Sequence, residues 1–174
     1  MKYCILLLLV LAFDCKQVES DNDIEQEIAE KVDSEIELEI YDYNDIEKFL
    51  NFKDNKTYVV NFWATWCAPC VKELPYFEEL GENYKNKDVE VILISLDFPK
   101  HFESKLIPFI EKHKLQSKVL VLDDPDMNTW IPKVNENWEG AIPATLIYNK
   151  DKRNFYEKSF NYEELKTEVD NFLN

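Results

Sequence analysis

Two cysteines separated by two residues, in Cys67-Ala68-Pro69-Cys70, have the clearest capacity for chemistry in this sequence. Two thiols at this spacing can close a small disulfide when they lie at the start of a helix. The first cysteine then lies at the helix N-terminus, where unpaired backbone N–H groups and the helix dipole stabilise a thiolate. The pattern therefore predicts that Cys67 attacks a partner and that Cys70, facing inward, resolves the mixed disulfide.

Half of a zinc site, or two structural thiols, is the alternative interpretation of this pair. Zinc takes about four ligands. The other candidates are His101, His113 and two cysteines near the N-terminus, Cys4 and Cys15. The two histidines fall on one predicted surface helix without ligand spacing to each other. We therefore expect no metal and assign neither histidine a role.

Strands and helices alternate around the motif. Residues 58–63 are β-branched and aromatic, which is typical of a central strand. A helix is predicted from Cys67 to about Lys85, with Pro75 inside it. The other predicted strands are 36–40, 89–96, 119–122, 145–148 and 155–160, and the other predicted helices are a short one capped by Asn44 or Asp45, 101–114, 126–133 and 162–173. This alternation predicts an α/β fold, a central sheet covered by helices.

Composition excludes several classes of protein. The 174 residues are 45% apolar and 14% aromatic, which is enough to bury the core of one domain. The net charge is −15 and Arg153 is the one arginine, so we expect no nucleic acid partner. Residues 19–47 contain thirteen acidic residues and one basic residue, and they account for most of that charge.

The N-terminal residues resemble a targeting signal. The apolar run 5–13 is shorter than the roughly 20 residues of a membrane-spanning helix and is typical of a secretory signal. Residues 11–15 resemble a bacterial lipobox, which predicts that Cys15 becomes a lipid anchor; cleavage after residues 18–20 by ordinary signal peptidase is the alternative.

These features predict a signal segment at 1–15, an acidic tether at 16–35 and a single domain at 36–174. The mature protein is expected outside the cytoplasm, in the bacterial periplasm, with membrane contact only through the lipid anchor.

Residues 60–75, which read VNFWATWCAPCVKELP, resemble the active-site stretch of extracytoplasmic thioredoxin-like proteins of the TlpA/ResA type, relatives of the AhpC/TSA group. Residues 140–145, which read GAIPAT, resemble the cis-proline loop of the same family. The resemblance covers about 36–174. It implies a thioredoxin-like fold with a central mixed β-sheet, and a thiol–disulfide oxidoreductase whose only redox group is the Cys67–Cys70 disulfide.

The resemblance also implies roles for residues near the cysteines. Pro143 matches the cis-proline, and the backbone of Ile142 would pair with a bound substrate chain as a short added strand. We expect Trp66, next to Cys67, on the partner-facing surface. The implied partners are proteins that carry thiols or disulfides and a membrane thiol electron donor, and we expect a monomer.

Two departures from plain thioredoxin stand out. Asn61 replaces the buried aspartate of cytoplasmic thioredoxins, whereas Glu73 matches a carboxylate that the TlpA/ResA branch keeps near its cysteines. A helix advances about 100° per residue, so Glu73 shares the inward face of Cys70, where burial would raise its pKa. It could then accept the Cys70 proton; a solvated helix residue is the alternative. The second departure is segment 98–139, which is longer than thioredoxin needs and matches the central insertion of the TlpA/ResA branch.

Two other functions remain open at this stage. A thiol peroxidase of the peroxiredoxin type would need a threonine three residues before its cysteine, where Ala64 stands. A redox-inactive adaptor would not need both Cys67 and Cys70. Only the helix N-terminus is available to stabilise the Cys67 thiolate, which favours a reducing protein over an oxidising one.

Overall fold

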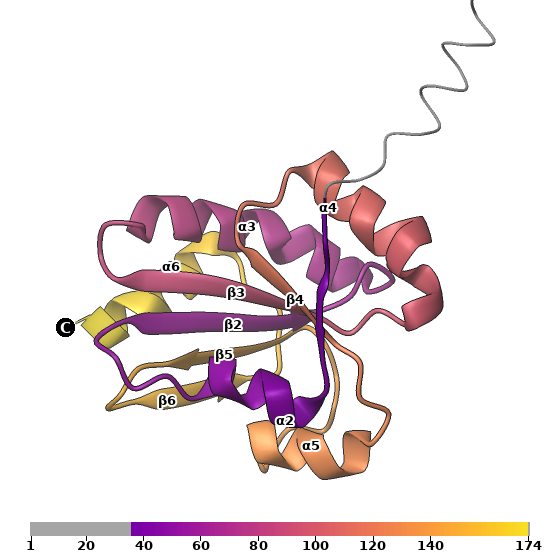
Figure 1. The fold of residues 1–174 in the computed structure, drawn as a ribbon. Coiled ribbons are helices and arrows are strands. Elements are labelled where there is room, and N and C mark those ends of the chain that lie inside the picture. The colour runs from indigo at the N-terminus through magenta and orange to yellow at the C-terminus, as the bar shows by residue number, and fades with distance from the viewer. Residues whose placement is uncertain (1–35, 174) are drawn as a thin grey trace, which may run out of the picture. The chain divides into compact units, whose positions relative to one another are not determined.

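The computed structural model describes residues 36–173, whose centre is a six-stranded mixed β-sheet (Figure 1). The strands are β1 (Glu39–Tyr41), β2 (Thr57–Trp63), β3 (Val89–Ser95), β4 (Lys118–Leu122), β5 (Ala144–Tyr148) and β6 (Arg153–Tyr156). Their order across the sheet is β1-β4-β3-β2-β5-β6. The first four strands run parallel, and β5 runs antiparallel to both of its neighbours. The expected α/β architecture is confirmed.

β2 is the central strand that leads to the two cysteines. All seven of its residues are buried. It pairs with β3 from Thr57 to Trp63 and with β5 from Tyr58 to Phe62. A strand with neighbours on both edges and helices over both faces favours the β-branched and aromatic residues found here. β2 ends at Trp63, so the loop 64–66 carries the chain directly into the next helix.

Helices cover both faces of the sheet, and the core is accordingly divided in two (Figure 1). Helices α3 (Ala68–Tyr84), α4 (Ile107–His113) and α6 (Tyr162–Leu173) pack on one face. Helix α2 (Tyr43–Ile46), the 3₁₀ turn Glu47–Leu50 and helix α5 (Met127–Val134) pack on the other. The side chains of β2 alternate between these layers: Val59 and Trp63 join the first core, and Val60 and Phe62 join the second.

Two expectations for the N-terminal part of the domain are wrong. The first helix is capped by Asp42, whose carboxylate accepts a 3.0 Å hydrogen bond from the Asp45 N–H, and not by Asn44 or Asp45. The helix begins earlier than predicted. The alternation of Ile36, Leu38 and Ile40 with acidic residues predicts one buried face for the first strand. Ile40 is instead 49% exposed, because β1 is a three-residue edge strand with a neighbour on one side only.

Two other boundaries also differ. Segment 101–114 is not one α-helix: it contains the end of the 3₁₀ turn Pro99–His101, a π-helical stretch Phe102–Leu106 and then α4. Pro108 has no N–H to donate to the preceding turn, which disturbs a regular α-helix at this point. β6 ends at Tyr156, whereas the predicted strand continued to residue 160.

The predicted signal segment 1–15 and tether 16–35 lie outside the described residues, as does the proposed anchor Cys15. Within residues 36–173, no helix is both long enough and apolar enough to cross a membrane.

Candidate active site

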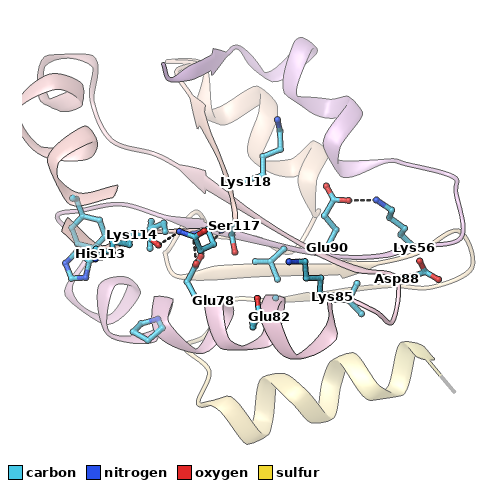
Figure 2. Close-up of a pocket in the computed structure, with 17 residues that line it drawn as sticks. Lys56, Glu78, Glu82, Lys85, Asp88, Glu90, His113, Lys114, Ser117 and Lys118 are labelled. Carbon is cyan, nitrogen blue, oxygen red and sulfur yellow. Dashed lines mark hydrogen bonds and ion pairs between the residues drawn. The ribbon is translucent and has the colours of Figure 1, made fainter. Parts of the chain in front are cut away.

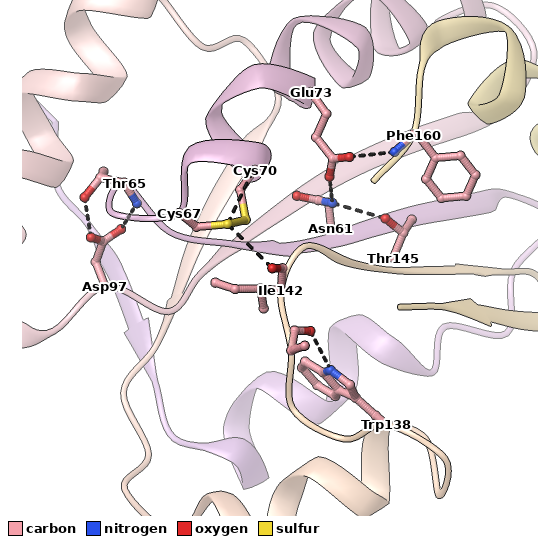
Figure 3. The surroundings of a disulfide bond; sticks show 11 residues. Asn61, Thr65, Cys67, Cys70, Glu73, Asp97, Trp138, Ile142, Thr145 and Phe160 are labelled. Carbon is pink, nitrogen blue, oxygen red and sulfur yellow. Dashed lines mark hydrogen bonds between the residues drawn. A yellow bond between two sulfur atoms is a disulfide. The ribbon is translucent and has the colours of Figure 1, made fainter. Parts of the chain in front are cut away.

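Cys67 and Cys70 form a disulfide at the N-terminus of α3 (Figure 3). Their sulfur atoms are 2.03 Å apart and their Cα atoms 5.3 Å apart. Cys67 is 6% exposed, whereas Cys70 is completely buried. Of the two sulfurs, that of Cys67 is therefore the one nearer to solvent and to an incoming partner.

The helix N-terminus is built around the Cys67 sulfur. Cys67 is the N-cap of α3, and its Sγ accepts a hydrogen bond from the backbone N–H of Cys70 at 3.3 Å. Pro69 lies in the first turn, where a missing N–H costs nothing. When the disulfide is reduced, this N–H and the helix dipole stabilise negative charge on Cys67.

The loop before β5 lies against the same sulfur. The Ile142–Pro143 peptide bond is cis, as expected, and the carbonyl oxygen of Ile142 lies 3.7 Å from Cys67 Sγ (Figure 3). The loop is tied down by Trp138, whose indole N–H donates to the Ala141 carbonyl at 2.9 Å. The carboxylate of Glu157 also accepts from the Ala141 N–H at 2.8 Å. These contacts fix the backbone that faces the disulfide.

Glu73 lies one turn after Cys70 on α3 and is 1% exposed. One carboxyl oxygen accepts from the Asn61 amide at 3.0 Å, and the other accepts from the Phe160 N–H at 2.7 Å. The Asn61 amide also donates to the Thr145 hydroxyl at 3.1 Å (Figure 3). Burial raises the pKa of Glu73 from 4.5 to about 7, although the hydrogen bonds from Phe160 and Asn61 act to lower it.

Asp97 holds the loop that precedes Cys67, and the sequence analysis missed it. It is 2% exposed and lies two residues after β3. Its carboxylate accepts from the Thr65 N–H at 2.9 Å and from the Thr65 hydroxyl at 2.5 Å (Figure 3). It also accepts from the Ser95 hydroxyl at 2.9 Å. Asp97 could have been identified from the sequence as a carboxylate just beyond a buried parallel strand, because the loops that follow neighbouring parallel strands meet at this edge of the sheet.

The tryptophans divide between surface and core. Trp66 is 52% exposed beside Cys67, as expected, and its ring stacks on that of Phe98. Trp63 is completely buried under α4, against Phe109. The sequence analysis did not single out Phe98, although it opens the predicted insertion 98–139.

A groove of about 690 Å³ lies at the other end of the sheet, and neither cysteine lines it (Figure 2). Its wall includes the start of β3, whereas the disulfide follows the end of the parallel strand β2. Two of its charged side chains pair with each other, Lys56 with Glu90 at 2.7 Å, and the carboxylate of Glu78 accepts from the backbone N–H of Gln116 at 2.6 Å. The groove is thus separate from the redox pair.

The described residues contain no group of three or more His, Cys, Asp or Glu side chains that could hold a metal ion. His113, one of the two histidines considered above, is exposed and stacks on Phe109 with ring centroids 4.1 Å apart.

The sheet order, the disulfide at the start of α3 and the facing cis-proline define a protein of thioredoxin-like fold. The chain belongs to the AhpC/TSA family, whose model matches residues 34–153. This confirms the family that the two sequence motifs indicated.

Curated relatives and solved structures agree with this assignment. A thiol-disulfide oxidoreductase ResA of Bacillus thuringiensis subsp. konkukian is 30% identical over 128 residues, covering 72% of this chain and 68% of the relative. A ResA of Bacillus cereus is 34% identical over 106 residues, covering 60% of this chain and 56% of the relative. The chain thus spans little more than half the length of several curated relatives it matches. A secreted disulfide oxidoreductase from Mycobacterium tuberculosis has the same fold, with a TM-score of 0.51 and 24% identity over 67% of this chain and 81% of that one.

Proposed function

We propose that this protein is a thiol–disulfide oxidoreductase that reduces disulfides of partner proteins. The observation that carries the proposal is the disulfide itself. One sulfur is capped by a helix N-terminus and faces the Ile142 carbonyl, and the other is buried three residues further along α3. The names of the ResA relatives support the same activity.

The reaction follows from the different exposure of the two sulfurs. In the reduced protein, the Cys67 thiolate attacks a partner disulfide. A new S–S bond forms to Cys67, the partner's S–S bond breaks, and the departing partner thiolate takes up a proton. Cys70 then loses its proton and attacks Cys67 Sγ, which closes the intramolecular disulfide and releases the second partner thiolate. Two electrons pass to the partner, and a thiol donor must return them.

Neighbouring groups have separate roles in this scheme. The backbone of Ile142 lies close enough to Cys67 to align an extended partner chain as an added strand, next to Pro143. Glu73 is the buried carboxyl group on the inward face of α3, and a pKa of about 7 suits it to accept the Cys70 proton near neutral pH. Asn61 does not titrate and orients that carboxyl group.

The predicted N-terminal signal and the name of one structural neighbour support a location outside the cytoplasm. The M. tuberculosis structure is described as a secreted protein. In that setting the electrons would come from a membrane thiol donor, and Cys15 would attach the protein to the membrane as a lipid anchor.

The redox state of the two cysteines in living cells tests the direction of the reaction. Thiols are trapped with an alkylating reagent that adds mass, and the oxidised and reduced forms are separated by electrophoresis. A mostly dithiol pair supports the reductase, and a mostly disulfide pair indicates an oxidase instead.

Turnover of the purified protein tests the activity itself. We expect reduction of a small disulfide such as bis(2-hydroxyethyl) disulfide, driven by a thiol donor, and its loss in Cys67→Ser. Peroxide consumption without disulfide reduction would indicate a peroxidase, and no turnover at all would indicate an adaptor.

A further inference from the structure

Two exposed aromatic rings lie together beside the reactive cysteine. Among residues 36–173, five large apolar side chains are more than a third exposed: Ile40, Trp66, Phe98, Met127 and Leu173. Two of these five contact each other. The rings of Trp66 and Phe98 are stacked, with centroids 6.1 Å apart and planes inclined by 19°. We call this pair the aromatic rim.

The residues just before each ring hold the rim in place. Thr65 precedes Trp66 and Asp97 precedes Phe98, and the Asp97 carboxylate accepts hydrogen bonds from both the N–H and the hydroxyl of Thr65. The N–H of Leu96 also donates to the Trp63 carbonyl at 2.8 Å. The two loops that carry the rings are thus tied together, so that a partner meets a preformed surface and little ordering entropy is lost on binding.

Phe98 is further supported from its own side of the rim. The ring of His101 meets it edge to face at 6.3 Å, and the Lys100 ammonium lies 5.9 Å from its centroid. These neighbours orient the Phe98 ring while leaving it 55% exposed. Two adjoining apolar rings that stay exposed are typical of a contact surface.

The position of Cys67 determines what covers the rim. Cys67 is only 6% exposed, so a partner disulfide must press closely against the surface to reach its sulfur. The residues flanking the partner cysteine then lie over the atoms around Cys67. Figure 3 shows Ile142 on one side of the disulfide and Thr65 with Asp97 on another. Trp66 and Phe98 follow Thr65 and Asp97 directly in the chain. A chain aligned along Ile142 therefore carries its neighbouring side chain toward the rim.

We propose that the aromatic rim selects partner polypeptides with an aromatic or large aliphatic side chain next to the target disulfide, and that Phe98 determines this specificity. The inference rests on the proposed oxidoreductase function and names its class of substrate. An apolar side chain loses water against the two rings, whereas a small polar one gains nothing there.

Two peptides that differ in one residue test the inference. Each peptide contains one cysteine joined in a mixed disulfide to the same thiol compound. The residue next to that cysteine is Leu in one peptide and Ser in the other. We expect the wild-type protein to reduce the Leu peptide with a kcat/KM about 5- to 10-fold higher, which is the range for one partly buried aliphatic group. The difference should lie mainly in KM, because the contact is the same in the ground and transition states.

Variants of Phe98 test whether the preference for the Leu peptide arises from the aromatic rim. In Phe98→Ser the ratio of the two kcat/KM values should fall to below about 2, since one of the two apolar rings is gone. Phe98→Leu should restore most of the preference. Met127→Ser is the matched control, because Met127 is a similarly exposed apolar residue on α5 and outside the rim, and it should keep the wild-type ratio.

Reduction of bis(2-hydroxyethyl) disulfide distinguishes failure of this inference from failure of the proposed function. If the wild-type protein reduces it but treats both peptides equally, or if Phe98→Ser keeps the full preference, the rim does not select partners and this inference is wrong while the proposed function stands. If the wild-type protein reduces neither that disulfide nor the peptides, the proposed function is wrong and the inference is rejected with it.

Discussion

The amide of Asn61 on β2 and the carboxyl group of Glu73 on α3 share a 3.0 Å hydrogen bond, and both side chains are almost completely buried. A neutral amide offers a carboxylate less stabilisation than a cation does. Burial therefore prevails, and the pKa of Glu73 rises to about 7. The protein thus holds a carboxyl group that changes its charge near neutral pH, one helical turn from Cys70.

Glu73→Gln should change how stability depends on pH. The folded protein keeps the Glu73 proton up to about pH 7, whereas the unfolded chain releases it near the usual value of 4.5. The folded state therefore binds more protons between these values, and its stability falls as pH rises through this window. Because Gln does not titrate, the variant should gain about 3 kcal/mol relative to wild type between about pH 4 and 8. Urea unfolding at several pH values measures this.

The same variant should slow the second step of exchange. Gln keeps the shape of Glu73 but cannot accept a proton, so attack by Cys70 on the mixed disulfide should be slower and its pH dependence altered. Glu79→Gln is the matched control, because Glu79 lies on the exposed side of α3. If Glu73→Gln leaves the exchange rate and the cysteine titrations unchanged between about pH 6 and 9, the proton-accepting role is wrong.

Cys70→Ser should trap mixed disulfides. Cys67 remains able to attack a partner in this variant, but the buried thiol that would release the partner is missing. Cys67→Ser keeps only a completely buried sulfur, so it should trap little. Non-reducing electrophoresis with a defined disulfide protein compares the two variants. Equal trapping would contradict the assignment of attacking and resolving cysteines.

The sequence predicted best the helices and strands whose surroundings keep one regular pattern along their whole length. β2 is buried along its whole length, so its composition alone indicates a central strand. α6 was predicted with the bounds that it has, Tyr162–Leu173, because its apolar residues follow a helical period. The site near Cys67 was predictable because the two cysteines and Pro143 belong to short motifs.

Features that depend on contacts between distant segments were not predictable. Ile40 is exposed only because β1 is a short edge strand, and no local pattern reveals which strands lie at an edge. The pairing of Thr65 with Asp97 joins residues 32 positions apart, and the contact of Phe98 with Trp66 follows from it. Single-sequence patterns report local periodicity and carry no information on such contacts.

Cys15→Ser tests the predicted lipid anchor. If Cys15 is lipidated, wild-type protein should be found in the membrane fraction of the producing bacterium, and the variant should move to the soluble fraction. Fractionation followed by immunoblotting measures this, and mass spectrometry of the mature N-terminus identifies the cleavage site. Soluble wild-type protein that begins at Asp21 would instead support cleavage after residues 18–20.

Asp97→Ala should destabilise the protein and loosen the loop before Cys67. The substitution leaves the half-buried Thr65 N–H and the buried Ser95 hydroxyl without the acceptor they now share. Leaving such donors unsatisfied costs about 2 to 4 kcal/mol in total. Asp97→Asn keeps one of the two oxygens, so its loss should be intermediate.

Urea unfolding of the oxidised proteins measures these differences, and Asp151→Ala provides the control, because Asp151 is an exposed acid that follows β5. The effect on the loop has a separate readout. Without the Asp97 carboxylate, Trp66 should exchange more readily between orientations. The ratio of kcat/KM for the Leu peptide to that for the Ser peptide should therefore fall in Asp97→Ala, even under conditions where the protein is fully folded. A variant as stable as wild type would mean that water replaces the carboxylate. The loop would then be held by the backbone bond between Leu96 and Trp63 and by the stacking of Trp66 on Phe98.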